Sequence, residues 1–135
     1  MGLDMYLFKR KKFRENDKEY NELVRDAEEE VCYWRKANEI RNWFVYNTDL
    51  DEDDNCRFIE LTREDLVYLK NDCIQVLENH SLADEIMPTA SGFFFGSVDY
   101  DEYYFDSLEY TVKKIDEILE NTDFNTEVIE YYEWW

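Results

Sequence analysis

The stretch "EVIEYYEWW", residues 127–135, decides the fold because it predicts a strand that needs a partner. It is rich in β-branched and aromatic residues and alternates in part between apolar and charged positions. The matching candidate is "GLDMYLF", residues 2–8, where Leu3, Met5 and Leu7 alternate with Asp4 and its neighbours. We therefore expect the first and last segments of the chain to pair in one sheet.

Helical periodicity begins after the first strand. Asn16 is a candidate N-cap for the apolar stripe Tyr20, Val24, Ala27 and Val31, and a second stripe with a shifted phase follows it. The second stripe consists of Tyr33, Ala37, Ile40 and Phe44. The two stripes predict either two helices that meet near Glu30 or one long helix whose buried face rotates.

A strand and further helices are predicted after the polar loop "NTDLDEDDNC", residues 47–56. "RFIEL", residues 57–61, predicts a short strand, and Thr62 predicts the start of a helix with an apolar stripe that runs to about Asn79. Ser81 can cap a single turn that Pro88 terminates. A last helix is predicted from the capping-box pair Asp106 and Glu109, with the stripe Leu108, Val112, Ile115 and Leu119.

These elements predict an α+β fold in which three to five helices pack on a small antiparallel sheet that joins the N- and C-terminal strands. A chain of 135 residues has the size of one domain, and no repeat or linker divides it, so we expect residues 1–135 to form a single domain. The three cysteines, Cys32, Cys56 and Cys73, have no C-x-x-C spacing and are expected to be small buried side chains in a reducing compartment.

The net charge of −19 is the strongest signal in the composition. With 44% hydrophobic residues the chain has enough material for a core, so the charge does not indicate disorder. Such a charge repels nucleic acid and anionic membranes. The first 14 residues are an exception, with five basic residues against one acidic residue. The basic segment from Lys9 to Arg14 either neutralises the protein's own acidic surface or reaches toward a target.

The segment "SGFFFGSVDYDEYYFD", residues 91–106, places aromatic rings beside carboxylates. A contact surface is built in this way, since Tyr and Phe supply area and carboxylates supply charge. An equally good interpretation is a buried loop anchor next to a helix N-terminus that favours acidic residues. The predicted contact residues here are Asp99, Tyr100, Asp101, Glu102, Tyr103 and Tyr104.

A second predicted contact segment is the acidic loop formed by Asp51, Glu52, Asp53 and Asp54. Asp49, Asp51, Asp53 and Glu60 match part of the calcium-loop spacing, but Asp54 occupies the position where the sharp turn requires glycine. A solvated loop is therefore the preferred interpretation, and no metal site is predicted. His80 is the sole histidine, and no phosphate-binding glycine loop is present in the sequence, so neither catalytic residues nor a cofactor are predicted.

The segment "EVCYWRKAN", residues 30–38, supports an alternative. In a helix Glu30, Trp34 and Asn38 share one face, with Arg35 beside them. An aromatic plane, a carboxylate, an amide and a guanidinium can line a pocket for a small anionic or nucleotide-like ligand, in a binding protein or an enzyme. The competing interpretation is a Trp at the edge of the core with ordinary local pairs.

Three runs resemble a family of small bacteriophage and prophage proteins: "MGLDMYL" at residues 1–7, "YWRKAN" at 33–38 and "SGFFFGSVDYDEYY" at 91–104. The resemblance implies a phage gene product that acts in the bacterial cytoplasm, and it assigns no activity. Small, very acidic phage proteins include anti-restriction and anti-CRISPR inhibitors that imitate the charge of DNA. A structural component of the phage particle is a further possibility.

The leading hypothesis is therefore a non-enzymatic inhibitor of a host defence nuclease that acts by nucleic-acid mimicry. Its expected partner is a host nucleic-acid-binding protein or nuclease, with no direct binding to nucleic acid or membrane, and the oligomeric state stays open. Carboxylates on successive helix turns lie about 5.4 Å apart along the axis, and phosphates along one DNA strand advance about 3.4 Å each, so acidic rows can imitate a nucleic acid.

Overall fold

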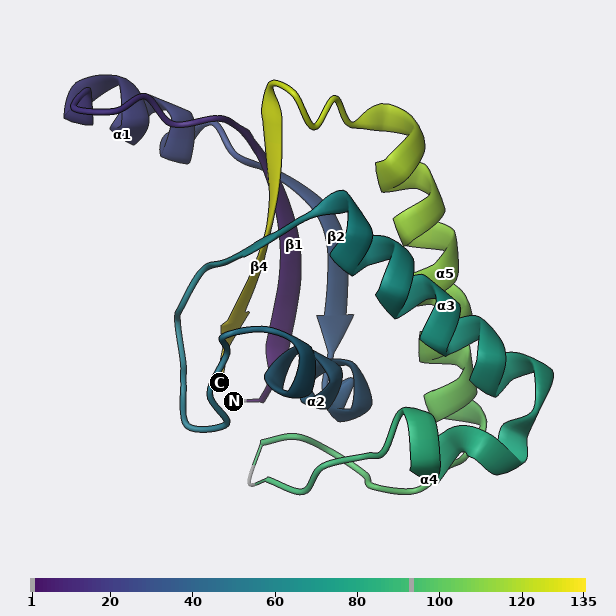
Figure 1. The fold of residues 1–135 in the computed structure, drawn as a ribbon. Helices are drawn as coiled ribbons and strands as arrows, with labels where there is room; N and C mark the ends of the chain where they lie inside the picture. Colours follow the sequence, from purple (N-terminus) through teal and green to yellow (C-terminus); the bar gives the residue numbers. More distant parts are fainter. Residues whose placement is uncertain (1, 93) are drawn as a thin grey trace.

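The first and last strands lie side by side in the middle of the sheet. In the computed structural model, which describes residues 2–92 and 94–135, β1 (Asp4–Lys11) pairs antiparallel with β4 (Glu127–Trp134) (Figure 1). The register places Asp4 opposite Trp134 and Lys11 opposite Glu127. The pairing predicted from residues 127–135 is confirmed, and β1 runs further than expected because the basic residues up to Lys11 belong to the strand.

The complete sheet has the order β2-β1-β4-β3 and is antiparallel throughout. β2 (Glu29–Arg35) pairs with β1, and the short β3 (Ile59–Leu61) pairs with β4. Helices α2, α3 and α5 lie on one side of this sheet, while α1 extends beyond one end of it (Figure 1). The predicted α+β class, with helices packed on a sheet that joins the two terminal strands, is confirmed.

The helix predicted across residues 29–35 is wrong, because these residues form β2. α1 (Lys18–Asp26) ends before it, and α2 (Asn38–Asn47) begins after it. Cys32 and Trp34 are buried while Tyr33 is exposed, which is the alternation of a strand. Asp17 caps α1 through its side chain, whereas the predicted cap Asn16 adopts a positive φ of 57° in the preceding turn.

The later helices agree better with their predictions. α3 (Arg63–Glu78) begins at Thr62, which forms a full capping box with Asp65. A turn of 3-10 helix (His80–Leu82) and α4 (Ala83–Ile86) follow. α5 (Glu102–Asn121) begins earlier than predicted, because Asp101 accepts a hydrogen bond from the Tyr104 backbone N–H, and Asp106 lies inside the helix.

The core lies between the sheet and the helices. Met5 and Leu7 of β1, and Leu3 just before it, are fully buried in this core. The ring of Phe44 on α2 stacks on Tyr131 of β4 with 4.1 Å between centroids. Burial of each such side chain contributes roughly 1.5–3 kcal/mol. Of the three cysteines, Cys32 and Cys73 are buried as predicted, whereas Cys56 is exposed. No helix among the described residues is long and apolar enough to cross a bilayer.

The basic segment mainly contacts the protein's own sheet and helices. Arg10 is 4% exposed, and its guanidinium bonds the Glu130 carboxylate at 3.0 Å and Glu60 at 2.7 Å. The Lys9 ammonium donates to the Asn121 carbonyl at 2.8 Å, and Lys11 lies 3.8 Å from Glu127. These contacts favour the first of the two roles considered for the segment, which is to neutralise neighbouring acidic residues.

Candidate binding surface

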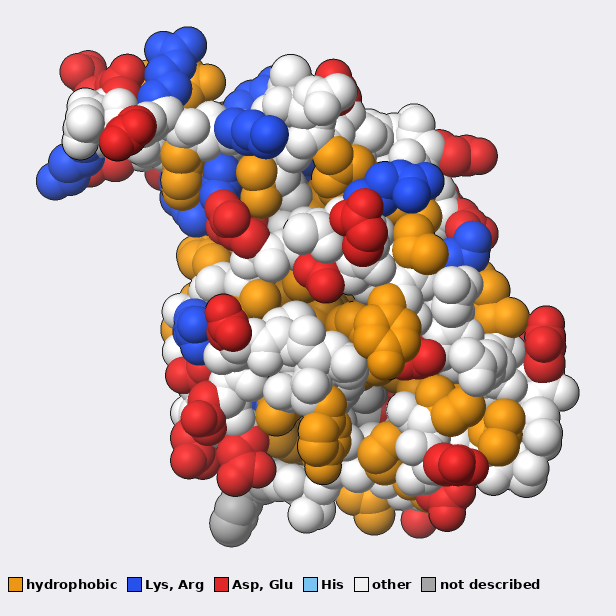
Figure 2. Space-filling view, viewed as in Figure 1, with side chains coloured by type: hydrophobic (Ala, Val, Ile, Leu, Met, Phe, Trp, Pro, Cys, Tyr) orange, Lys and Arg blue, Asp and Glu red, His pale blue; other side chains and the backbone are white. Residues whose placement is uncertain are grey.

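The structure brings the two predicted acidic segments to the same end of the molecule. Residues 51–54 follow α2, residues 99–101 precede α5, and both segments lie at the lower end of the view in Figure 1. Figure 2 shows Lys and Arg side chains gathered over the upper part of this face, around α1 and the start of α3. Asp and Glu side chains gather at the lower left, over the loop that follows α2. Basic side chains are therefore concentrated at one end of this face, whereas acidic side chains lie at both ends.

α2 holds the segment that leads into α5. The Asn38 side chain accepts from the Ala90 backbone N–H at 3.0 Å and donates to the carbonyls of Phe95 and Ser97 at 2.9 and 2.8 Å. One turn later, the Asn42 amide donates to the Pro88 carbonyl at 3.0 Å. Because Asn38 is 1% exposed and uses its amide oxygen and nitrogen on this loop, it organises the loop and does not face a ligand.

The same helix holds the acidic loop through Arg41. The Arg41 Nη2 donates to the carbonyls of Glu52 and Asp54 at 2.8 and 3.2 Å, while its Nε bonds the buried Glu133 carboxylate at 2.9 Å. Its guanidinium also lies over the ring of Phe95, 4.9 Å from the centroid. One buried cation therefore contacts the acidic loop, the final strand and the segment before α5.

The carboxylates of the acidic loop point mostly to solvent. Asp51, Glu52 and Asp53 are exposed, and Asp54 is half-buried. Two hydrogen bonds to the Asp54 carboxylate lower its pKa. The larger effect comes from the Asp51 backbone N–H and the smaller one from the Arg57 guanidinium, at 2.7 Å. Among the described residues no three side chains of metal-binding type converge on one point.

The residues around the start of α5 divide into exposed and structural ones. Asp99 and Glu102 are exposed, and Tyr100 and Tyr103 expose 39% and 64% of their surface. Asp101 is exposed but also caps α5. Tyr104 is different, because it is 3% exposed and its hydroxyl donates to the Met87 carbonyl at 2.7 Å. Its predicted role as a contact residue is therefore corrected to one in the core.

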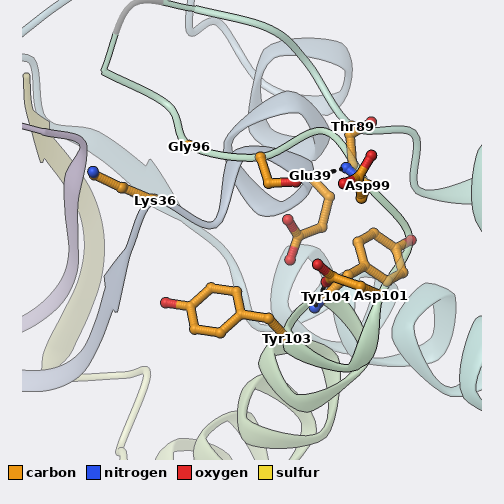
Figure 3. Close-up of a pocket in the computed structure, with 9 residues that line it drawn as sticks. Lys36, Glu39, Thr89, Gly96, Asp99, Asp101, Tyr103 and Tyr104 are labelled. Carbon is orange, nitrogen blue, oxygen red and sulfur yellow. Dashed lines mark hydrogen bonds between the residues drawn. The ribbon is translucent and has the colours of Figure 1, made fainter.

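A pocket of about 330 Å³ opens beside these residues, between the start of α2 and the start of α5 (Figure 3). Glu39 points into it from α2, Lys36 and Tyr103 line it, and Asp99 and Asp101 line it from the segment before α5. The sequence analysis did not identify Glu39, because a single glutamate next to an asparagine in a helical pattern ordinarily faces solvent.

Glu39 is a buried acid. Only 4% of its surface is exposed, and its Oε1 forms a short hydrogen bond with the Ser107 hydroxyl of α5. Burial raises the pKa of Glu39 to about 7, the Ser107 hydrogen bond acts in the opposite direction, and the charge of Asp101 raises the pKa further. The group therefore titrates close to neutral pH.

A second groove, of about 350 Å³, lies on the other side of Tyr103 and contains part of the alternative site. Trp34 and Arg35 line it together with Tyr110. Trp34 is 3% exposed, and its indole N–H donates to Thr111 at 2.8 Å, so only a small part of the ring reaches the groove. Glu30 and Asn38 lie outside it, since β2 carries Glu30 and Asn38 begins α2. The prediction that Glu30, Trp34 and Asn38 share one face of a helix is therefore wrong.

The chain was also compared with known proteins. Neither the protein-family models, nor the curated proteins, nor the solved structures compared with this chain give a match.

Proposed function

We propose that this protein is an acidic binding protein that docks on a positively charged surface of a partner. The observation that carries the proposal is the joint position of residues 51–54 and 99–103 at one end of the molecule. Hydrogen bonds from α2 hold the backbone of the first segment directly and hold the chain just before the second segment, at Phe95 and Ser97. A backbone that is held in place before binding loses little conformational entropy when a basic partner approaches. Exposed Tyr100 and Tyr103 supply contact area beside the charge.

The partner class proposed is a nucleic-acid-binding protein. Glu102, Asp106 and Glu109 are exposed on α5, and their spacing corresponds to rises of about 6 Å and about 4.5 Å along the helix. This spacing is comparable in scale to the advance of phosphates along a nucleic-acid strand. The resemblance to phage proteins favours a host defence nuclease of the restriction or CRISPR type, met in the bacterial cytoplasm, as the target.

The test compares two variants with equal loss of charge. One neutralises the proposed surface by Asp53→Asn, Asp99→Asn and Glu102→Gln, and the other neutralises distant exposed sites by Glu15→Gln, Glu19→Gln and Glu120→Gln. No hydrogen bond or ion pair between described residues involves the three carboxylates of the first set, so the fold is expected to persist. Affinity for a partner captured from a bacterial lysate is then measured at increasing salt.

Neutralising the proposed surface is expected to weaken partner binding about tenfold at low salt and to flatten its salt dependence. The distant variant is expected to bind nearly as the unmodified protein does. Equal losses in the two variants would show that only the total charge matters. An affinity that does not change between low and moderate salt would contradict docking by charge.

The groove beside Trp34 favours a second candidate, a small-molecule-binding protein or an enzyme. Tyr33, Tyr103 and Tyr110 supply aromatic lining, and Arg35 supplies a guanidinium near an apolar surface, which suits an aromatic anion such as a nucleotide. A thermal-shift screen with nucleotides tests it, because a ligand at 100 times its Kd stabilises the folded protein by about 2.7 kcal/mol. Absence of any shift, with Tyr103→Ala and wild type behaving alike, would reject this candidate.

A further inference from the structure

Glu39 differs from the other buried carboxylates in what surrounds it. Among the described residues, Glu130 is paired with Arg10 and Arg25, and Glu133 with Arg41. Asp72 accepts a hydrogen bond from the Trp43 indole N–H. Glu39 is bonded by the Ser107 hydroxyl and its own backbone N–H. It has no ion-pair partner in the described chain, and it points into a pocket. A buried carboxylate without a cation is costly in an isolated protein.

The hydrogen bond to Ser107 does not fully satisfy Glu39. The Ser107 hydroxyl has one hydrogen, and its oxygen also lies 2.7 Å from the Tyr104 carbonyl. When that hydrogen is donated to the carbonyl, an ionised Glu39 receives no hydrogen bond from Ser107. The carboxylate therefore has acceptor sites left for a donor in the pocket.

The other groups of the pocket favour a positive charge. Asp99 and Asp101 line it from the segment before α5, and Tyr103 and Tyr104 present aromatic rings from α5, whose faces attract cations. Among the described residues that line it, Lys36 is the one basic side chain, and in Figure 3 its ammonium extends away from Glu39. No ion pair between Lys36 and a described carboxylate is formed within 4.0 Å.

We propose that this pocket binds an organic cation, an ammonium or a guanidinium group, with Glu39 as its buried counter-ion. The carboxylates that line the pocket lie on α2 and on the segment before α5. No three metal-binding side chains among residues 2–92 and 94–135 meet at one point. That arrangement suits a cation whose charge and hydrogen-bond donors are spread over several atoms more than it suits a metal ion. A volume of about 330 Å³ accommodates such a group together with part of an aliphatic chain.

The cation has two possible sources with the same chemistry. It is either a free small amine or guanidine, or the side chain of an arginine or lysine on the proposed basic partner. The second source rests on the proposed function, because Asp99 also belongs to the docking surface. The first does not, so small probes test the pocket even if no partner exists.

The experiment is a calorimetric titration at about pH 8 and about 0.15 M salt, where Glu39 is ionised and surface attraction is screened. The probes are agmatine, and the peptide acetyl-Gly-Arg-Gly-amide with its Gln-containing counterpart as control. The proteins are wild type, Glu39→Gln and Glu120→Gln, which removes the same charge from a distant exposed site on α5. Asp99→Asn provides an independent exposed variant should Glu39→Gln fold poorly.

We expect one agmatine site in wild type, a loss of about tenfold or more in affinity for Glu39→Gln, a smaller loss for Asp99→Asn and no change for Glu120→Gln. Binding of the Arg peptide but not the Gln peptide would assign the pocket to a partner's side chain, and binding of agmatine alone would assign it to a free cation. Failure of both cationic probes at millimolar concentration, or equal affinity in Glu39→Gln and Glu120→Gln, would overturn the proposal. Neither result would bear on the salt-dependent docking of the acidic surface.

Discussion

At the scale of single residues, Glu39 links stability to pH. Its pKa is 4.5 in the unfolded chain and about 7 in the folded protein, so the folded state binds more protons between these pH values. The free energy of unfolding therefore falls as pH rises through this window. Lys36, Asp99, Asp101, Tyr103 and Tyr104 face the group from the pocket, and Cys73 faces it from α3.

Glu39→Gln should remove this dependence, because glutamine keeps a hydrogen-bond partner for Ser107 but does not ionise. The stability of the variant relative to wild type is expected to increase by up to about 3 kcal/mol between pH 4.5 and pH 8, since one pKa unit corresponds to 1.36 kcal/mol. Urea unfolding of both proteins across this range measures it. A constant difference at all pH values would mean that Glu39 titrates normally.

Arg41 gives a second prediction at this scale. Arg41→Met leaves the Glu133 carboxylate buried without its cation and removes the donors to the acidic loop, so we expect a loss of about 3–5 kcal/mol. The double variant with Glu133→Leu should recover part of that loss, because it no longer buries an unpaired charge. Arg57→Met, at an exposed pair, should cost less than about 1 kcal/mol and serves as the control. Denaturant titration of the four proteins distinguishes these cases.

At the scale of elements, the start of α5 depends on Asp101. Asp101→Ala removes the acceptor for the Tyr104 N–H and should destabilise the protein by about 1 kcal/mol, whereas Asp101→Asn keeps a good N-cap and should cost little. Partner binding separates the two roles of this residue, because the Asn variant loses the charge but keeps the cap. Similar stability of the Ala and Asn variants would indicate that the helix begins elsewhere.

The same scale shows what the sequence could predict. The terminal strands and the Thr62 capping box were recoverable because alternation and local capping are properties of neighbouring residues. β2 could not be recovered in the same way. Val31 continues one helical stripe and Tyr33 and Ala37 begin another, so the local pattern is compatible with a helix as well as with a strand. Only the pairing with β1 decides between the two.

The candidate site shows the same division between local and long-range signals. The exposure of residues 51–53 and 99 follows from composition. The pocket does not, because Glu39 becomes buried only when α5 places Ser107 against it, 68 residues away.

At the scale of the whole molecule, the net charge of −19 sets two responses to salt with opposite signs. Repulsion among exposed carboxylates destabilises the free protein, and the screening length falls from about 30 Å at 0.01 M to about 10 Å at 0.1 M salt. The buried pairs Arg10–Glu130 and Arg41–Glu133 are screened little, so added salt should mainly relieve the repulsion and raise the melting temperature.

Partner binding should respond in the opposite way, because the attraction between the acidic end and a basic surface is screened by the same ions. We therefore expect the melting temperature to rise and the affinity to fall over the same salt range. The variant with Asp53→Asn, Asp99→Asn and Glu102→Gln should show a weaker response of both. Thermal melts and binding titrations in one buffer series measure the two responses. A partner whose affinity rose with salt would instead bind through the apolar groove at Tyr103, since burial of apolar surface is strengthened by excluded salts.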